Sequence, residues 1–250
     1  MKLHAVLSLI RDSVSSVVFP DVCYFCGSIK DSKESVICAE CRDSIRSVPM
    51  PFCSVCGLPL PALENSASDF CGSCLSHPPV YDKARYGVYY EQQAREAITK
   101  FKFNASLFNV RPITELLIEA FNRHYADDKL DAILPIPVHQ RRLINRGFNQ
   151  VVTLAKKLSD ATSIPLDRTT LVKIRNTDPQ VGLPRSKRIM NLKNVFRISC
   201  PEKIANRRIL IIDDVSTTGT TVSEAAKTVK KAGADYVAIL VLALRSKKGG

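Results

Sequence analysis

Apolar runs without polar alternation predict the strands of a buried sheet in the later two-thirds of the chain. Residues 209–212 form the clearest run, with four apolar residues and no polar break, and residues 236–244 form the longest. Residues 86–90, 131–138 and 171–174 are shorter or less regular runs. Such runs are typical of parallel strands that are buried on both faces.

Segments with apolar residues at helical spacing alternate with these runs. Residues 91–103, 112–125, 151–159 and 222–232 each place apolar side chains on one face of a helix. Alternating strands and helices predict an α/β domain with a mostly parallel sheet.

The cysteines lie mainly in the first third of the chain, where eight of the nine form four C-x-x-C pairs. Each pair places two thiolates on one side of a tight turn, and two such turns complete a tetrahedral site for Zn²⁺. We predict two structural zinc sites, because a small loop-rich module buries too little core to be stable alone. The spacing favours pairing in sequence order, and a cross-braced pairing of the first pair with the third stays open. The expected ligands are Cys23, Cys26, Cys38, Cys41, Cys53, Cys56, Cys71 and Cys74.

A disulfide framework is the competing explanation for these cysteines, but it requires an oxidising compartment. Residues 1–19 carry apolar side chains at helical spacing, interrupted by Arg11 and Asp12, and no small-residue cleavage site follows. We therefore expect an amphipathic helix there and a cytoplasmic protein. No run reaches the roughly 18 apolar residues that a membrane span requires.

The formal charge of +12 is distributed unevenly. Residues 1–80 contain 6 Lys and Arg against 8 Asp and Glu, and residues 81–250 contain 30 against 16, which gives −2 and +14. Pro78 and Pro79 separate the two parts, so we expect a helix and zinc-binding domain over residues 1–80 and a basic domain over residues 81–250. A basic domain favours polyanions such as pyrophosphate or nucleic acid.

Residues 208–221 join a predicted strand to a predicted helix through two acids and a hydroxyl-rich loop. The acids can accept hydrogen bonds from the 2′- and 3′-hydroxyls of a ribose. The helix N-terminus, one glycine and the Ser and Thr hydroxyls suit a phosphate. The segment therefore predicts binding of a ribose 5-phosphate through Asp213, Asp214, Val215, Ser216, Thr217, Thr218, Gly219, Thr220 and Thr221.

Two further loops are rich in basic and amide side chains. One follows the strand predicted at 131–138, at the edge where open α/β sheets bind ligands, and the other spans 175–194 and suits a flap over an anionic substrate. Arginine binds phosphate oxygens bidentately, so pyrophosphate or a nucleic-acid backbone is the expected ligand. The candidate residues are His139, Arg141, Arg142, Arg146, Asn149, Gln150, Arg185 and Arg188.

Together these segments resemble the ComF family, whose members are described as amidophosphoribosyltransferase-like proteins linked to DNA uptake. R-G-F-N-Q at 146–150 is the most discriminating piece. P-I-P-V-H at 135–139, I-I-D-D-V-S-T-T-G-T-T at 211–221 and the eight cysteines extend the resemblance over nearly the whole chain.

The resemblance implies a type I phosphoribosyltransferase-like fold, with a mostly parallel sheet, preceded by a small double zinc-ribbon domain. It implies phosphoribosyl pyrophosphate (PRPP) as the ligand, with Asp213 and Asp214 on the ribose hydroxyls and the following loop on the 5′-phosphate. Mg²⁺ would bridge pyrophosphate and ribose oxygens, because it prefers phosphate oxygens and few protein ligands. The expected role is in DNA uptake during natural competence, or in DNA utilisation.

Three functional hypotheses stay open at this point. The chain is an enzyme that transfers a phosphoribosyl group, although neither the acceptor nor a catalytic residue can be identified. Alternatively, it is a non-catalytic factor that binds single-stranded DNA and uses the PRPP loop as a ligand sensor. In the third hypothesis the zinc ribbons bind a partner such as a competence helicase.

Overall fold

The computed structural model describes residues 21–30, 35–61, 69–103, 107–139, 143–144, 147–175 and 194–246. The helix predicted over residues 1–19 and most of the flap predicted over residues 175–194 lie outside these ranges.

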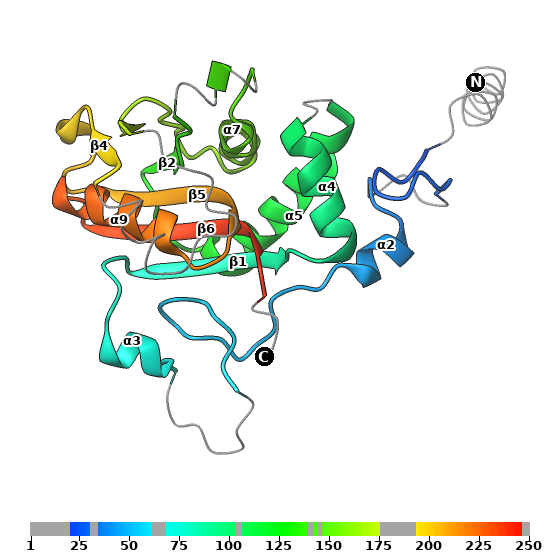
Figure 1. Ribbon diagram of the computed structural model, residues 1–250, viewed down its shortest axis with the longest axis horizontal. Helices are drawn as coiled ribbons and strands as arrows, with labels where there is room; N and C mark the ends of the chain where they lie inside the picture. Colours follow the sequence, from blue (N-terminus) through cyan, green and yellow to red (C-terminus); the bar gives the residue numbers. More distant parts are fainter. Residues whose placement is uncertain are drawn as a thin grey trace, which may run out of the picture.

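Four parallel strands form the central sheet, in the order β1-β6-β5-β2 (Figure 1). They are β1 (Lys83–Tyr89), β2 (Ala132–Pro135), β5 (Arg208–Ser216) and β6 (Tyr236–Leu244). The inner strands β5 and β6 are almost entirely buried. Their apolar runs therefore reflect burial on both faces, and the predicted α/β class with a mostly parallel sheet is confirmed.

Helices cover both faces of this sheet. Helices α4 (Gln92–Phe103), α5 (Leu107–Tyr125) and α7 (Gln150–Thr162) share one apolar core with Leu210 and Ile212 of β5. Helix α9 (Thr220–Lys231) packs on the other face, against Ile209 and Ile211. Successive residues of β5 thus supply opposite layers, as the period of a strand requires.

A small antiparallel pair extends the α9 layer. It consists of β3 (Leu171–Lys173) and β4 (Phe196–Ile198), and the short 3-10 helix η1 (Pro201–Lys203) follows β4. Leu171 and Phe196 lie in the same apolar core as α9.

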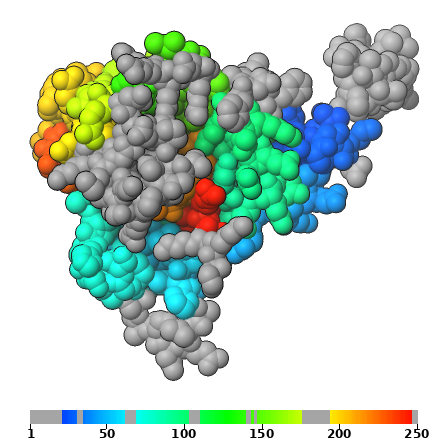
Figure 2. All heavy atoms as spheres, viewed as in Figure 1, coloured from blue at the N-terminus to red at the C-terminus, as the bar shows by residue number. Residues whose placement is uncertain are grey.

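The first ribbon, which carries the cysteines from Cys23 to Cys41, packs beside α4 and α5. Its helix α2 (Ala39–Ser44) contributes Cys41 to their core, and Arg42 Nη1 donates to Glu119 Oε1 of α5 at 2.6 Å. In the space-filling view this ribbon is the blue lobe beside the green helices (Figure 2).

The second ribbon, which carries the cysteines from Cys53 to Cys74 and helix α3 (Gly72–Ser76), lies against the edge strand β1. Ala84 N donates to Val55 O at 2.7 Å, and the buried Arg85 donates from Nη1 to Ser54 O at 3.0 Å. Hydrogen bonds to main-chain carbonyls therefore connect the zinc module to the sheet. The boundary predicted between residues 80 and 81 stays a prediction.

Several element boundaries differ from the expected ones. Strand β2 ends at Pro135, short of residue 138, and α5 begins at Leu107 with Pro112 inside it. Strand β5 continues to Ser216, so the two acids lie in the strand and not beyond it. Within the described residues, no helix is long and apolar enough to cross a membrane.

Candidate ribose-phosphate site

The hydroxyl-rich loop, residues 216–221, connects β5 to α9. Gly219 is the N-cap residue of α9 and has a φ of +73°, a left-handed conformation that glycine adopts without strain. Thr220 and Thr221 form the first turn of the helix, and the hydroxyls of Thr218 and Thr220 lie 2.7 Å apart. The loop therefore places hydroxyls at a helix N-terminus, where main-chain N–H groups favour an anion.

Two adjacent carboxyls precede this loop in the last part of β5. Asp213 and Asp214 are buried, with exposed fractions of 8% and 6%. Asp213 Oδ1 accepts from Asp214 N at 2.9 Å, and Asp214 Oδ1 accepts from Val215 N at 2.6 Å. Burial, with repulsion by Asp214, raises the pKa of Asp213 to about 8. Asp213 therefore holds a proton more tightly than an exposed carboxyl does.

Lys102 is part of this site, although sequence reasoning missed it. Its Nζ lies 3.0 Å from Asp214 Oδ2, near the C-terminal end of α4. The contact joins residues more than 100 positions apart, so no local motif contains it. One sequence signal indicates that Lys102 faces inward: it is four residues after Ile98, on the face that α4 buries.

The described part of R-G-F-N-Q, Gly147 to Gln150, leads the chain into α7 and toward the acids. Phe148 packs against Phe101 of α4, with ring centroids 6.0 Å apart. Asn149 caps α7 by accepting from Val151 N at 3.0 Å, and it donates to Ile136 O at 3.3 Å. Gln150 is buried and donates from Nε2 to Asp214 Oδ2 at 3.0 Å. Both amides thus contact the protein itself, and their predicted role in pyrophosphate binding stays a prediction.

Of the other residues predicted for the basic loops, the structure describes only His139. His139 follows β2, and its carbonyl oxygen accepts from Leu143 N at 3.1 Å. Arg141, Arg142, Arg146, Arg185 and Arg188 lie outside the described residues.

The cysteines form two separate tetrads, Cys23, Cys26, Cys38 and Cys41, and Cys53, Cys56, Cys71 and Cys74. Within each tetrad all four Sγ atoms lie within 4.8 Å of one another. Pairing is therefore in sequence order, and the cross-braced alternative is wrong. Four thiolates at this separation fit tetrahedral Zn²⁺.

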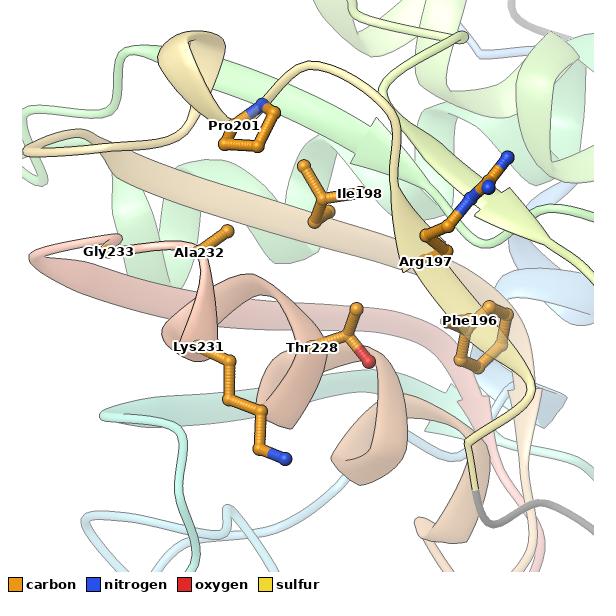
Figure 3. Close-up of a pocket in the computed structure, with 8 residues that line it drawn as sticks. All are labelled: Phe196, Arg197, Ile198, Pro201, Thr228, Lys231, Ala232 and Gly233. Carbon is orange, nitrogen blue, oxygen red and sulfur yellow. The ribbon is translucent and has the colours of Figure 1, made fainter.

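A hollow at the other end of α9 is distinct from this site (Figure 3). Residues of β4 and η1 line it together with Thr228 and Lys231 near the C-terminus of α9. Thr228 is eight residues after Thr220, so the hollow begins about 12 Å along the helix axis from the hydroxyl-rich loop.

Comparison with known families matches both parts of the chain. A double zinc ribbon domain model matches residues 14–75, and a phosphoribosyl transferase domain model matches residues 110–250. Competence protein F of Haemophilus influenzae is 30% identical over 225 residues, which cover 88% of this chain and 96% of that protein. This chain belongs to the ComF family.

Other relatives of this ComF-family chain carry related names. The DNA utilization protein YhgH of Escherichia coli K12 is 31% identical, over 89% of this chain and 96% of that protein. Competence protein ComFC of Bacillus subtilis is 26% identical, over 92% of this chain and 91% of that protein. Both the predicted fold and the two predicted zinc sites are thus confirmed by the family match and the cysteine geometry.

Proposed function

We propose that this chain binds PRPP at Asp213, Asp214 and residues 215–221, and that it acts in DNA uptake or DNA utilisation. The observation that supports the binding site is the junction of β5 and α9 in a phosphoribosyl transferase domain. There, two buried acids directly precede hydroxyls at a helix N-terminus. The names of the relatives support the cellular role.

Each part of PRPP finds complementary chemistry at this junction. The 5′-phosphate would accept hydrogen bonds from the N–H groups and hydroxyls of residues 216–221. The ribose hydroxyls would donate to the acids, which cannot bind the phosphate because like charges repel. The pyrophosphate would face the basic loop after β2, with Arg141, Arg142 and Arg146 as its candidate ligands.

Mg²⁺ is compatible with the residues present. The ion keeps several waters and binds phosphate oxygens with only one or two carboxylates, so it requires no cage of protein ligands. Asp213 and Asp214 are the carboxylates that could hold it. When bound, the ion would neutralise charge on the pyrophosphate, the leaving group of a phosphoribosyl transfer.

Calorimetric titration of the zinc-loaded protein with PRPP and MgCl₂ tests the proposal. We expect PRPP to bind, and Asp213→Ala combined with Asp214→Ala to weaken its binding by about tenfold or more, because two acceptors for ribose hydroxyls are lost. Inorganic pyrophosphate titrated without MgCl₂ has neither a ribose nor a bound metal for the acids to hold, so its affinity should not fall in the same variant.

Asp160→Ala is the matched control, since Asp160 is an exposed acid that pairs with Lys156 on α7. It should leave PRPP binding unchanged. Equal PRPP affinity in the wild type and the double variant would show that the acids are not the ribose site.

The charge distribution supports a second candidate function, binding of single-stranded DNA. The net charge of +14 over residues 81–250 provides the cations that a phosphate backbone requires. In this alternative the protein is not an enzyme, and PRPP acts as a sensed ligand.

A further inference from the structure

Two donors from two helices meet on one oxygen of Asp214. Lys102 Nζ from α4 and Gln150 Nε2 from α7 each lie 3.0 Å from Oδ2. With Val215 N on Oδ1, Asp214 accepts from three described groups. Its carboxyl is therefore oriented by contacts from three elements of the fold.

Lys102 departs from the pattern of its own helix. Ala94, Ile98 and Phe101 make the buried face of α4 apolar, and Lys102 continues that face. The side chain of Lys102 is 21% exposed, whereas that of Lys100 is 61% exposed and pairs with Glu96 on the outer face. An ion pair that is largely withdrawn from water costs desolvation that an apolar contact would avoid, so helix packing alone does not explain the charge.

The charge has an electrostatic role beside the acids. Two neighbouring buried carboxyls repel each other, and burial further disfavours their ionised forms. The charged groups that face Asp213 are Asp214 on β5, Lys102 on α4 and Lys173 on β3. Because Lys102 Nζ lies 3.0 Å from Asp214 Oδ2, its positive charge offsets part of the repulsion between the two carboxyls.

We propose that Lys102 is a positioning residue for the ribose-phosphate ligand: with Gln150, it holds the Asp214 carboxyl in the orientation that accepts hydrogen bonds from the ribose hydroxyls. This inference rests on the proposed PRPP site. Lys102 acts through Asp214 and does not need to contact the ligand.

Gln150 provides a second observation at the same place. The residue is 5% exposed, and its Oε1 is buried without a hydrogen-bond partner in the described part of the protein. A buried acceptor without a donor is costly, which makes it a candidate partner for a ligand hydroxyl or an ordered water. The orientation of the Gln150 amide agrees with this hydrogen bond, since its N–H₂ group donates to the Asp214 carboxyl and its oxygen points elsewhere.

The test is a double-mutant cycle on the zinc-loaded full chain, with PRPP and MgCl₂ as the probe. Lys102→Met keeps a long side chain without charge, and we expect it to weaken PRPP binding by about tenfold or more, the usual effect of losing a charged hydrogen bond. Lys102→Arg should restore part of the affinity. In an Asp214→Asn background, Lys102→Met should weaken binding by less than about twofold, because the carboxylate it acts on is gone.

Lys100→Met is the matched control on the same helix, and its PRPP affinity should equal that of the wild type. Thermal unfolding of each variant without ligand separates folding from positioning. If Lys102→Met does not fold, Lys102→Gln and Lys102→Arg repeat the cycle with a polar side chain at the position.

Two results would overturn the inference while leaving the PRPP site intact. In the first, the wild-type protein binds PRPP and Lys102→Met binds it with the same affinity. The other is an equal loss in the wild-type and Asp214→Asn backgrounds, which would mean that Lys102 contacts the ligand itself. Absence of PRPP binding in the wild type would instead overturn the proposed function, and the inference with it.

Discussion

Gly57 of the second ribbon lies directly against the main-chain carbonyl of Ala84 in β1. A Cβ at Gly57 would overlap the carbonyl oxygen and lie 3.1 Å from the carbonyl carbon. The corresponding glycine of the first ribbon, Gly27, has a similar left-handed φ, but a Cβ there would meet no described atom within 4 Å. The chain thus contains two equivalent knuckle glycines, of which only one is confined by the sheet.

We expect Gly57→Ala to be more destabilising than Gly27→Ala. Both substitutions force a left-handed conformation on alanine, which costs about 1 kcal/mol. Gly57→Ala adds an overlap with β1, for a total of about 3 kcal/mol. Denaturant unfolding of the zinc-loaded variants measures both values, and equal destabilisation would contradict the close contact.

We expect the purified protein to contain two zinc ions per chain, since the cysteines form two tetrads. Cys41→Ser should reduce the content to about one and lower the stability, because Cys41 is both a ligand and part of the core with α4 and α5. Cys200→Ser is the control, since Cys200 belongs to neither tetrad. Elemental analysis by mass spectrometry checks the counts, and two zinc ions retained in Cys41→Ser would contradict the assigned ligands.

The buried Asp213 makes the stability of the ligand-free protein depend on pH. Burial raises the pKa of this carboxyl to about 8 from 3.8, so the folded state binds its proton more tightly than the unfolded state does. The resulting stabilisation is complete below about pH 4 and is lost as the pH rises through about 8.

Asp213→Asn should remove this dependence. Between pH 6 and pH 9 we expect the wild type to lose about 3 kcal/mol more stability than the variant, since two pKa units correspond to that energy. Urea unfolding at the two pH values measures the difference. Parallel losses in both proteins would show that Asp213 does not carry the bound proton.

Binding of single-stranded DNA, the second candidate function, predicts a steep dependence on salt. Each phosphate contact contributes a slope of about −0.7 in a plot of log affinity against log salt. Arg141→Ala with Arg142→Ala should weaken binding and flatten the slope by about one to two units. Lys156→Ala, which removes a cation that pairs with Asp160, is the control. An affinity that does not change with salt would exclude this function.

The sequence predicts the sheet well because its inner strands are buried on both faces. Residues 209–212 and 236–244 carry no polar break, and both lie in central strands. The end of β5 is not visible in the sequence because main-chain pairing continues past the acids, with Val215 opposite Ala243 and Ser216 opposite Leu244. Such pairing does not depend on side-chain polarity.

The start of α5 differs from the prediction for another reason. Proline is typical of the first position of a helix, so the sequence predicts that this helix begins at Pro112. Val110 and Ile113 are buried in the core, and this packing favours helix on both sides of the proline.

The candidate site could be predicted only where it is local in sequence. The acids and the hydroxyl-rich loop are consecutive, so their chemistry is visible in one segment. Lys102 and Gln150 reach Asp214 from separate helices, and this convergence exists only after α4 and α7 have packed on the sheet. Asn149 illustrates the same limit, because its role as a helix cap depends on where α7 begins.

The contact of the second ribbon with β1 has a consequence for solubility. Strand β1 is one of the two outer strands of the sheet. On its free side, Ala84 N donates to Val55 O of the ribbon, and Tyr89 N donates to Arg46 O of the segment that precedes the ribbon. A chain that loses zinc from this ribbon would release the Ala84 N–H and uncover part of this strand edge to other chains. Exposed edges of this kind are templates for intermolecular pairing, so metal starvation should lead to aggregation of the ComF-family chain before its central strands unfold.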